Sequence, residues 1–320
     1  MGSTENEIKL QTIAFYNLEN LFDIYNDGQT NDDDFLPTSV KKWTKKRYQK
    51  KIYKLGSAIS KIGFESTNKP PALVGLAEVE NDLVLKDLIQ SEELAIYNYG
   101  FVHYDSNDER GIDVALLYDK NEFNIESSET FTVYLEAPNG ERDFTRDILL
   151  VSGLLDGDLI HVIVNHWPSR HEGEDETSYK RTIASEKVLE IIAKLKMQYD
   201  IPKIIVIGDF NDNPNNESIK LLSNNANLNN VTEALWSYQR GTESHDFQWN
   251  LFDQILLSEN FMNSNQMGYQ FESADIFDDK FMTQFHGKYQ GQPFRTYVGK
   301  KYMGGFSDHF PVYAILKKVI

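Results

Sequence analysis

Residues 203–211 read Lys203-Ile204-Ile205-Val206-Ile207-Gly208-Asp209-Phe210-Asn211, an apolar run that ends in polar side chains. The consecutive apolar and β-branched residues predict a strand that is buried on both faces. Asp209 and Asn211 are two residues apart, so on an extended segment their side chains lie on the same side. Rigid strands that carry such side chains at their ends are where layered α/β proteins build ligand sites.

The same pattern recurs along the chain and predicts the fold class. Strands are expected at 10–16, 72–76, 114–118, 159–164, 203–207 and 254–257. Helical spacing of apolar residues predicts amphipathic helices within 48–62 and 178–199. The strands outnumber the helices and alternate with them only in places. This organisation favours a sheet-rich α/β sandwich over a dinucleotide-binding sheet or a barrel.

Other strand ends also carry polar residues that can bind metals. They are Asn17-Leu18-Glu19-Asn20 after 13–16, Glu78 after 73–77, Asn165-His166 after 162–164, Asp253 within 251–257, and Ser307-Asp308-His309 before 310–312. Carboxylate and amide oxygens suit Mg²⁺, Ca²⁺ or Mn²⁺. The chain has no cysteine and no H-E-x-x-H, phosphate-loop or G-x-S-x-G motif. A hard cation with histidines and amides suits a phosphate ester, whose transition state spreads charge over several oxygens.

The composition limits the class of protein. The chain has 320 residues, 40% of them hydrophobic, which excludes a disordered or low-complexity protein. No apolar run approaches the roughly 18 residues needed to span a bilayer. The formal charge of −17 argues against a protein that coats nucleic acid through bulk charge, but it leaves room for an enzyme with a local basic groove.

The chain is expected to form a single domain over residues 8–320. Residues 1–7 resemble an artificial chain start or a disordered tail, so a signal segment could have been removed. The compartment is unknown from the sequence, with secretion or the periplasm favoured over the cytoplasm. We expect a monomer.

Seven fragments, in the expected order, resemble the endonuclease/exonuclease/phosphatase superfamily, and its deoxyribonuclease I-like branch in particular. They are FYNLENLF at 15–22, GLAEVEN at 75–81, RGIDVALLY at 110–118, NHWPSR at 165–170, GDFND at 208–212, FDQILLS at 252–258 and SDHFPV at 307–312. The set looks most like bacterial nucleases of this superfamily. The resemblance implies a four-layer sandwich of two packed mixed β-sheets flanked by helices, with the active site at one edge.

The resemblance also implies a metal site and a catalytic set. Glu78 would be the main ligand of Mg²⁺ or Mn²⁺, assisted by Asp308, with Asn17 and Glu19 beside it. The residues expected to carry the chemistry are Asp209 for the attacking water, Asn211 for the phosphate, His309 oriented by Asp253, and His166 oriented by Asp113. Which histidine acts as base and which as acid stays open. His103 and four other histidines lie outside these motifs and are interpreted as surface or packing residues.

Further charged groups have two interpretations each. Arg110, Arg170 and Arg181 are candidates to bind substrate phosphate, because guanidinium groups match phosphate oxygens. Arg110 and Arg181 could equally form structural ion pairs. The basic segment 41–51 is either a nucleic-acid-binding face or the solvated side of a helix. The acidic segment 23–34 is read as a solvated loop, with a structural Ca²⁺ as the alternative.

The sequence therefore predicts a divalent-metal-dependent phosphodiester hydrolase, a nuclease that cleaves DNA or RNA. The alternative is a phosphatase or phosphodiesterase that acts on a lipid or a small phosphorylated molecule. A more remote alternative is a non-catalytic binding protein on the same fold.

Overall fold

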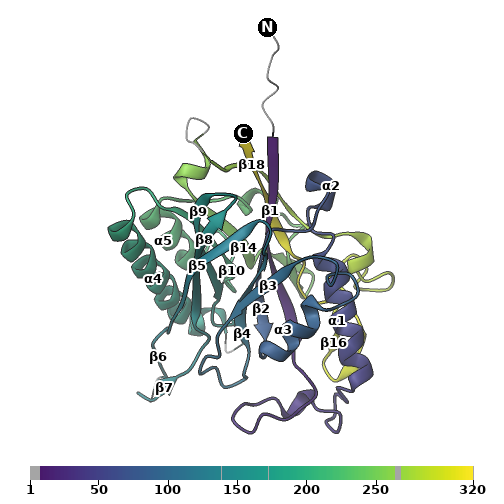
Figure 1. Ribbon diagram of the computed structural model, residues 1–320. Helices are drawn as coiled ribbons and strands as arrows, with labels where there is room; N and C mark the ends of the chain where they lie inside the picture. The colour runs from purple at the N-terminus through teal and green to yellow at the C-terminus, as the bar shows by residue number, and fades with distance from the viewer. Residues whose placement is uncertain (1–7, 138, 172, 264–267, 320) are drawn as a thin grey trace.

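Two six-stranded β-sheets lie face to face at the centre of the molecule (Figure 1). The structure, a computed structural model, describes residues 8–137, 139–171, 173–263 and 268–319, so the expected tail at 1–7 lies outside the described residues. In order across the first sheet, the strands are β15 (Gln270–Ile276), β18 (Val312–Val319), β1 (Ile8–Leu21), β2 (Leu73–Val79), β4 (Asp113–Asp119) and β3 (Tyr99–His103). Across the second sheet they are β11 (Leu228–Asn230), β14 (Asp253–Ser258), β10 (Lys203–Asp209), β9 (Asp158–His166), β8 (Ile148–Leu155) and β5 (Phe123–Phe131).

Helices cover the outer face of each sheet, which completes the four layers (Figure 1). The first sheet carries α1 (Lys45–Ile59) and α3 (Asp82–Ile89), and the second carries α4 (Glu174–Gln198) and α5 (Glu217–Ala226). The short helix α2 (Phe64–Thr67) packs near β1. Three small hairpins lie outside the sheets: β6 (Leu135–Glu136) with β7 (Arg142–Asp143), β12 (Glu243–His245) with β13 (Gln248–Asn250), and β16 (Tyr297–Val298) with β17 (Lys301–Tyr302). Single 3₁₀ turns are η1 (Asp33–Phe35), η2 (Glu233–Leu235), η3 (Glu259–Phe261) and η4 (Lys280–Met282). The predicted fold class is confirmed.

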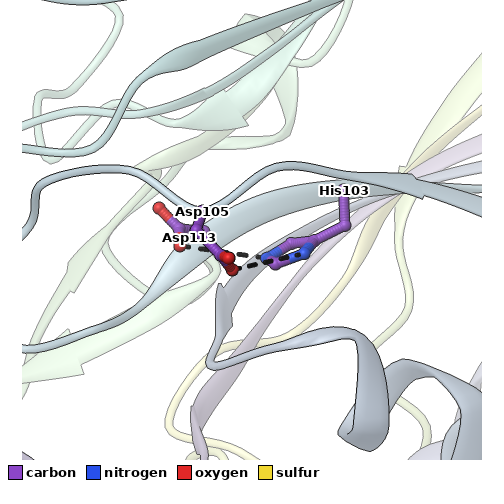
Figure 2. A group of neighbouring side chains, drawn as sticks. All are labelled: His103, Asp105 and Asp113. Carbon is purple, nitrogen blue, oxygen red and sulfur yellow. Dashed lines mark ion pairs between the residues drawn. The ribbon is translucent and has the colours of Figure 1, made fainter.

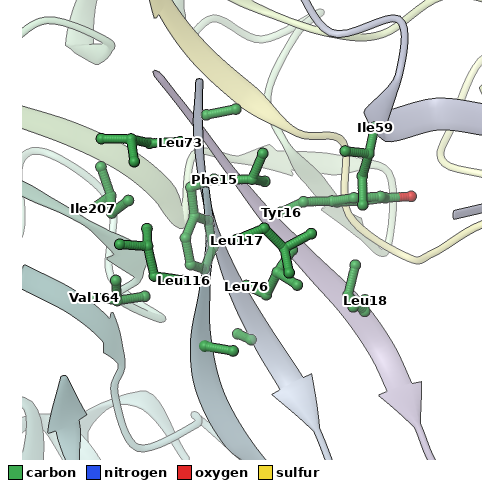
Figure 3. Close-up of a cluster of buried hydrophobic side chains, with 14 of the residues drawn as sticks. Phe15, Tyr16, Leu18, Ile59, Leu73, Leu76, Leu116, Leu117, Val164 and Ile207 are labelled. Atoms are coloured by element: carbon green, nitrogen blue, oxygen red, sulfur yellow. The ribbon is translucent and has the colours of Figure 1, made fainter. Parts of the chain in front are cut away.

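Alternation along the strands separates the two faces of the first sheet (Figure 3). Phe15 and Leu116 point toward Val164 and Ile207 of the second sheet, whereas Tyr16, Leu76 and Leu117 lie on the opposite side of the sheet, where Ile59 of α1 covers them. Successive side chains of a strand point to opposite faces, so one strand supplies both layers of the core. This explains why β1 and β4 read as continuous apolar runs.

Strand direction brings the polar strand ends to one edge. The pairs β1–β2 and β9–β10 are parallel, so Asn17, Glu78, His166 and Asp209 all lie near the carboxyl ends of their strands. The strands β4, β14 and β18 are antiparallel to these neighbours, so the residues at their amino ends reach the same edge. The chain termini lie at the other end of the sheets, where Ile8 pairs with Val319 (Figure 1).

None of the helices in the described ranges combines the length and the apolar character that a membrane-spanning segment requires.

Candidate active site

The backbone turns sharply where these strands end. Glu19, Asn20, Glu78 and Asn211 all have a positive φ, between 50° and 62°, a conformation that costs about 1–2 kcal/mol for a residue with a Cβ. In β1 and β2 the same residues coincide with breaks in the strand register. Strained backbone that gathers at one edge of a sheet is typical of functional sites, where the surrounding structure holds side chains in a required direction.

Asp209 is the centre of the site. One of its carboxylate oxygens, Oδ2, lies 3.8 Å from Nε2 of His166 and 3.9 Å from Nε2 of His309. The same oxygen accepts a hydrogen bond of 2.9 Å from Asn17, and Oδ1 accepts one of 2.9 Å from the backbone of Asn211. Burial raises the pKa of Asp209 to about 6, although His309 opposes the shift. The two predicted imidazoles therefore lie near the same carboxylate oxygen.

Asp253 contacts His309. Its Oδ2 lies 2.7 Å from Nδ1 of the ring, and the carboxylate is fully buried. Burial opposes protonation of His309, but the carboxylates of Asp253 and Asp209 outweigh it and raise the pKa of His309 well above its ordinary value. The second oxygen of Asp253, Oδ1, has no hydrogen-bond partner within the described part of the chain.

His166 has a different neighbour from the one expected. Its ring nitrogens lie 3.3 Å and 2.9 Å from Nε and Nη2 of Arg146, and Nη1 of Arg146 pairs with Asp108 at 3.3 Å. Burial and the positive charge of Arg146 lower the pKa of His166 well below its ordinary value. The contacts of Asp113 are instead with the backbone of Ser106 and with His103, so its expected role toward His166 is replaced by that of Arg146. The loop between β3 and β4 turns the Asp113 carboxylate toward His103.

The expected metal ligands Glu78 and Asp308 line the same cavity as Asn17, Asp209 and His309. Glu78 accepts a hydrogen bond of 2.6 Å from the backbone of Asn20 and lies 4.0 Å from His166. Asp308 pairs with Arg295 at 3.0 Å. Ligand atoms of Asp209, Asp253 and His309 lie within 4.8 Å of one another. This oxygen-rich set, with an unsatisfied buried carboxylate oxygen, fits a hard divalent cation.

Glu19 does not line the cavity, although the charge of Asp308 acts on it. Its two carboxylate oxygens accept backbone hydrogen bonds from Thr296 at 2.5 Å and Tyr297 at 3.2 Å. The ammonium group of Lys51, which is buried, lies 3.9 Å from it. Burial raises the pKa of Glu19 to about 7. Because backbone donors and Lys51 satisfy its carboxylate, Glu19 acts as a structural acceptor and not as the metal ligand that was expected.

The three candidate arginines occupy three different environments. Arg110 is 43% exposed at the cavity and contacts Asn20, so its guanidinium remains accessible to a substrate. Arg170 is held by the backbone of Asn211 at 2.6 Å and by Asp212 at 2.8 Å. Arg181 is fully buried and pairs with Asp212 at 2.8 Å. The expectation that Arg181 binds phosphate is therefore wrong: it fixes the loop that carries Asn211.

The basic segment 41–51 and the acidic segment 23–34 each contain both solvent-exposed residues and residues held by local contacts. In 41–51, Lys45, Lys46 and Lys50 are exposed, whereas Lys51 is buried and Arg47 donates to the backbone carbonyls of Lys41 and Lys42. In 23–34, Asp23 and Asp32 accept hydrogen bonds from their own loop, at Tyr25 and Asp27. Within the described ranges, no three acidic or imidazole groups of this segment come close enough to share an ion. The alternative of a structural Ca²⁺ in this loop therefore has no support there.

The cavity at this edge has a volume of about 1800 Å³ and continues beyond the central carboxylates to an aromatic rim. The sequence motifs miss Arg146, Arg295 and Glu243, which also line it. The aromatic rim consists of Trp236, Tyr238, Phe247, Trp249 and Phe252, of which only Phe252 falls within a motif. The only sequence signal for the rim is the density of aromatic residues between 236 and 252.

Comparisons with known proteins agree with this geometry. The sequence pattern of the endonuclease/exonuclease/phosphatase family matches residues 12–318. A family protein from Bacteroides thetaiotaomicron has 19% identity and a TM-score of 0.61, over 98% of this chain and 100% of its own. A mannosyl-6-phosphatase from the same species has 18% identity and a TM-score of 0.59, over 96% and 99%. D. rerio TDP2, solved with a single-strand DNA product, has 15% identity and a TM-score of 0.56, over 96% and 98%.

The curated protein sequences contain no significant match. At these identities the solved structures establish the fold alone, whereas the family pattern covers nearly the whole chain. The site contributes a buried Asp/His cluster that could bind a metal ion. The chain therefore belongs to the endonuclease/exonuclease/phosphatase family and is a metal-dependent phosphoester hydrolase.

Proposed function

We propose that the protein is a nuclease that hydrolyses phosphodiester bonds in single-stranded nucleic acid, with Mg²⁺ or Mn²⁺ as its cofactor. The observation that carries the proposal is the extent of the cavity. A volume of about 1800 Å³ exceeds the roughly 300–1,000 Å³ of a typical small-molecule site. A cavity of this size, open to an aromatic rim, suits a polymer that continues on both sides of the scissile phosphate.

The chemistry follows from the residues around Asp209. Glu78 and Asp308 would hold the cation, which would neutralise the phosphate and the leaving oxygen when bound. Asp209, between the two imidazoles, is placed to orient the attacking water. His309, with its pKa raised, can donate a proton or a hydrogen bond to phosphate, whereas the neutral His166 can only share its single ring proton. Arg110 supplies an accessible guanidinium for the phosphate backbone.

The aromatic rim supports a substrate that carries bases. Phe247 is at the tip of the β12–β13 hairpin, where both turn residues, Asp246 and Phe247, have a positive φ (46° and 64°). Two-residue turns of this kind prefer Asn-Gly or Asp-Gly, and a bulky residue there is a conformational outlier. Phe247 stacks on Tyr289 at 5.4 Å and remains 48% exposed. An exposed ring held at such cost at the rim of the cavity is suited to stack on a base.

A second candidate is hydrolysis of a phosphorylated sugar. The similarity to a mannosyl-6-phosphatase over 96% of this chain is the observation that favours it. Such a substrate would use the central carboxylates and Arg110 but would leave the aromatic rim without a ligand.

The experiment is a substrate panel at fixed Mg²⁺ or Mn²⁺, with single-stranded DNA, RNA, plasmid DNA, a sugar monophosphate and sphingomyelin. The variant His309→Ala and the addition of a chelator serve as negative controls. We expect cleavage of single-stranded nucleic acid that is absent in both negative controls. Phe247→Ala should raise KM for single-stranded DNA about tenfold, since a stacked base contributes roughly 1–3 kcal/mol. Phe285→Ala is the matched control, because Phe285 is 60% exposed and does not line the cavity.

If the protein releases phosphate from the sugar monophosphate but does not cleave nucleic acid, the nuclease proposal is wrong and the second candidate function is supported. An unchanged KM in Phe247→Ala would show that the aromatic rim does not contribute to substrate binding. Absence of metal-dependent turnover on every substrate would contradict both candidates.

A further inference from the structure

A second group of potential metal ligands lies outside the active site. It is formed by His103 at the end of β3, Asp105 in the following loop, and Asp113 at the start of β4 (Figure 2). One ligand atom from each residue lies within 4.8 Å of the others. None of the three lines the active-site cavity. The group is therefore a separate feature, for which the proposed hydrolysis has no use.

His103 has a buried nitrogen without a partner. Its side chain is only 2% exposed, and Nε2 has no hydrogen-bond partner among the residues that the structure describes. The nearest acidic oxygen, Oδ2 of Asp113, is 3.8 Å away, which is too long for a hydrogen bond. Two ligands of one tetrahedral ion, each roughly 2.0–2.2 Å from it, lie about 3.3–3.6 Å apart, so a shift of a few tenths of an ångström would bring both atoms onto one ion.

The other ring nitrogen is arranged as it is in metal sites. Nδ1 of His103 lies 3.2 Å from Oδ1 of Asp82, at the start of α3. If Nδ1 carries the proton and donates it to Asp82, Nε2 presents its lone pair toward Asp113. A histidine that binds a metal through one nitrogen and donates the other N–H to a carboxylate is the common arrangement in proteins.

The local charge also favours a cation. Three carboxylates lie near the ring: Asp82 and Asp105 at 3.2 and 4.0 Å from Nδ1, and Asp113 at 3.8 Å from Nε2. Asp108, which acts on Asp113, is paired with Arg146.

We propose that His103, Asp105 and Asp113 bind a first-row transition-metal dication, with Zn²⁺ as the best match. One imidazole and two carboxylates, with water in the fourth position, form a donor set that Zn²⁺ accepts, whereas Mg²⁺ and Ca²⁺ prefer oxygen alone. Asp105 is 86% exposed, so the ion can enter from solvent. The bound ion neutralises the carboxylates and ties the loop between β3 and β4 to both strands. That loop carries Arg110, which lines the active site.

The test measures metal binding by the full chain, without reference to activity. The metal-binding groups of the active site are first removed in a Glu78→Gln/Asp308→Asn/His309→Gln background, which also disrupts the cluster of Asp209, Asp253 and His309, and the stripped protein is dialysed against Zn²⁺ in excess Mg²⁺. Elemental analysis should find one equivalent of zinc. Co²⁺ in place of Zn²⁺ should give the visible absorption of a four-coordinate site. His103→Gln should lose that equivalent. His245→Gln is the matched control, since His245 pairs with Asp246 at 3.7 Å but is 78% exposed.

Asp105→Asn supplies a variant whose folding is not in question, because its side chain is exposed. It should weaken Zn²⁺ binding about tenfold or more. Circular dichroism checks that His103→Gln is folded; if it is not, Asp105→Asn decides. Retention of zinc in folded His103→Gln, unchanged affinity in Asp105→Asn, or no zinc in the background variant would each overturn the proposal.

Discussion

At the scale of single residues, the contact between Asp253 and His309 is the one on which the proposed chemistry depends most directly. Asp253→Asn keeps the shape of the side chain but removes its charge, and the amide can present an N–H to Nδ1 of the ring. The imidazole is then held in the wrong tautomer, and the raised pKa of His309 falls. Because general acid–base catalysis typically contributes 10²–10⁴-fold, we expect kcat to fall by about that factor. Steady-state kinetics on single-stranded DNA measures the loss.

The control for Asp253→Asn is Asp246→Asn, which changes a carboxylate that is 93% exposed beside His245. Its kcat should equal that of the wild type. If Asp253 had a purely structural role, Asp253→Asn would lower the unfolding free energy but leave kcat of the folded fraction intact. Both quantities are therefore measured. Near-normal kcat in folded Asp253→Asn would contradict the orienting role.

A site residue could be predicted from the sequence when its own strand sets the direction of its side chain. Asp209 is the last residue of β10, and its Oδ2 lies 3.8 Å from His166 and 3.9 Å from His309. Asp113 also begins a strand, but a loop from 104 to 112 decides what its carboxylate faces. Arg146 comes from the segment before β8, and no motif marks it. Contacts that depend on loop conformation leave no periodic signal in the sequence.

At the scale of elements, the six strands expected from the sequence match β1, β2, β4, β9, β10 and β14, whereas the other six strands of the two sheets were not predicted, and the helix ends were predicted less closely. β10, Lys203–Asp209, starts at the residue where the apolar run begins. α4 starts at Glu174, four residues before the expected position, because its first turn is polar and carries three acidic residues that suit a helix amino end. Apolar spacing detects the part of a helix that packs on a sheet, and a solvated first turn has no such pattern.

The strand β9 contains a second buried histidine that makes stability depend on pH. His161 is fully buried, with Nδ1 at 2.8 Å from Ser152 and the ring 4.6 Å from that of Tyr199. Burial lowers the pKa of His161 to about 4, from about 6.5 in the unfolded chain. The unfolded state therefore binds the proton first as pH falls. The stability that neutral His161 contributes is complete above about pH 6.5 and is lost progressively toward pH 4.

Urea denaturation between pH 7 and pH 4 measures this loss. The wild type should lose about 3 kcal/mol more unfolding free energy over that window than His161→Gln, which cannot titrate. Carboxylates whose pKa is raised in the folded state act in the opposite direction, but they are common to both proteins and cancel in the difference. His245→Gln should follow the wild type. Parallel pH curves for the wild type and His161→Gln would contradict the assignment.

At the scale of the whole molecule, the active site exists because two separate sheets are held in one relative position. Asn17 and Glu78 come from the first sheet, whereas His166, Asp209 and Asp253 come from the second. A slip between the sheets would separate the cation ligands from the imidazoles. The tightness of the interface between the sheets is therefore a functional requirement as well as a contribution to stability.

Gly75 on β2 tests how tightly the sheets are packed. A Cβ added there would lie 2.6 Å from Cδ1 of Ile207 on the facing strand β10 and 3.0 Å from the ring of Phe15. Gly75→Ala should therefore destabilise the protein by about 1–3 kcal/mol through overpacking. Ile207→Val removes the methyl group that is in the way and should alone cost about 0.5–1.5 kcal/mol.

The double variant Gly75→Ala/Ile207→Val should lose less unfolding free energy than the sum of the two single variants, because the smaller side chain makes room for the new methyl group. The matched control is Gly75→Ala/Ile163→Val, since Ile163 lies on the other face of the second sheet, in the core beneath α4. That pair should be additive within about 0.5 kcal/mol. Urea denaturation of all variants gives both coupling energies. Additivity in the Gly75–Ile207 pair would mean that the sheets are loosely packed at this point. Other contacts would then have to maintain the relative position of the two halves of the active site.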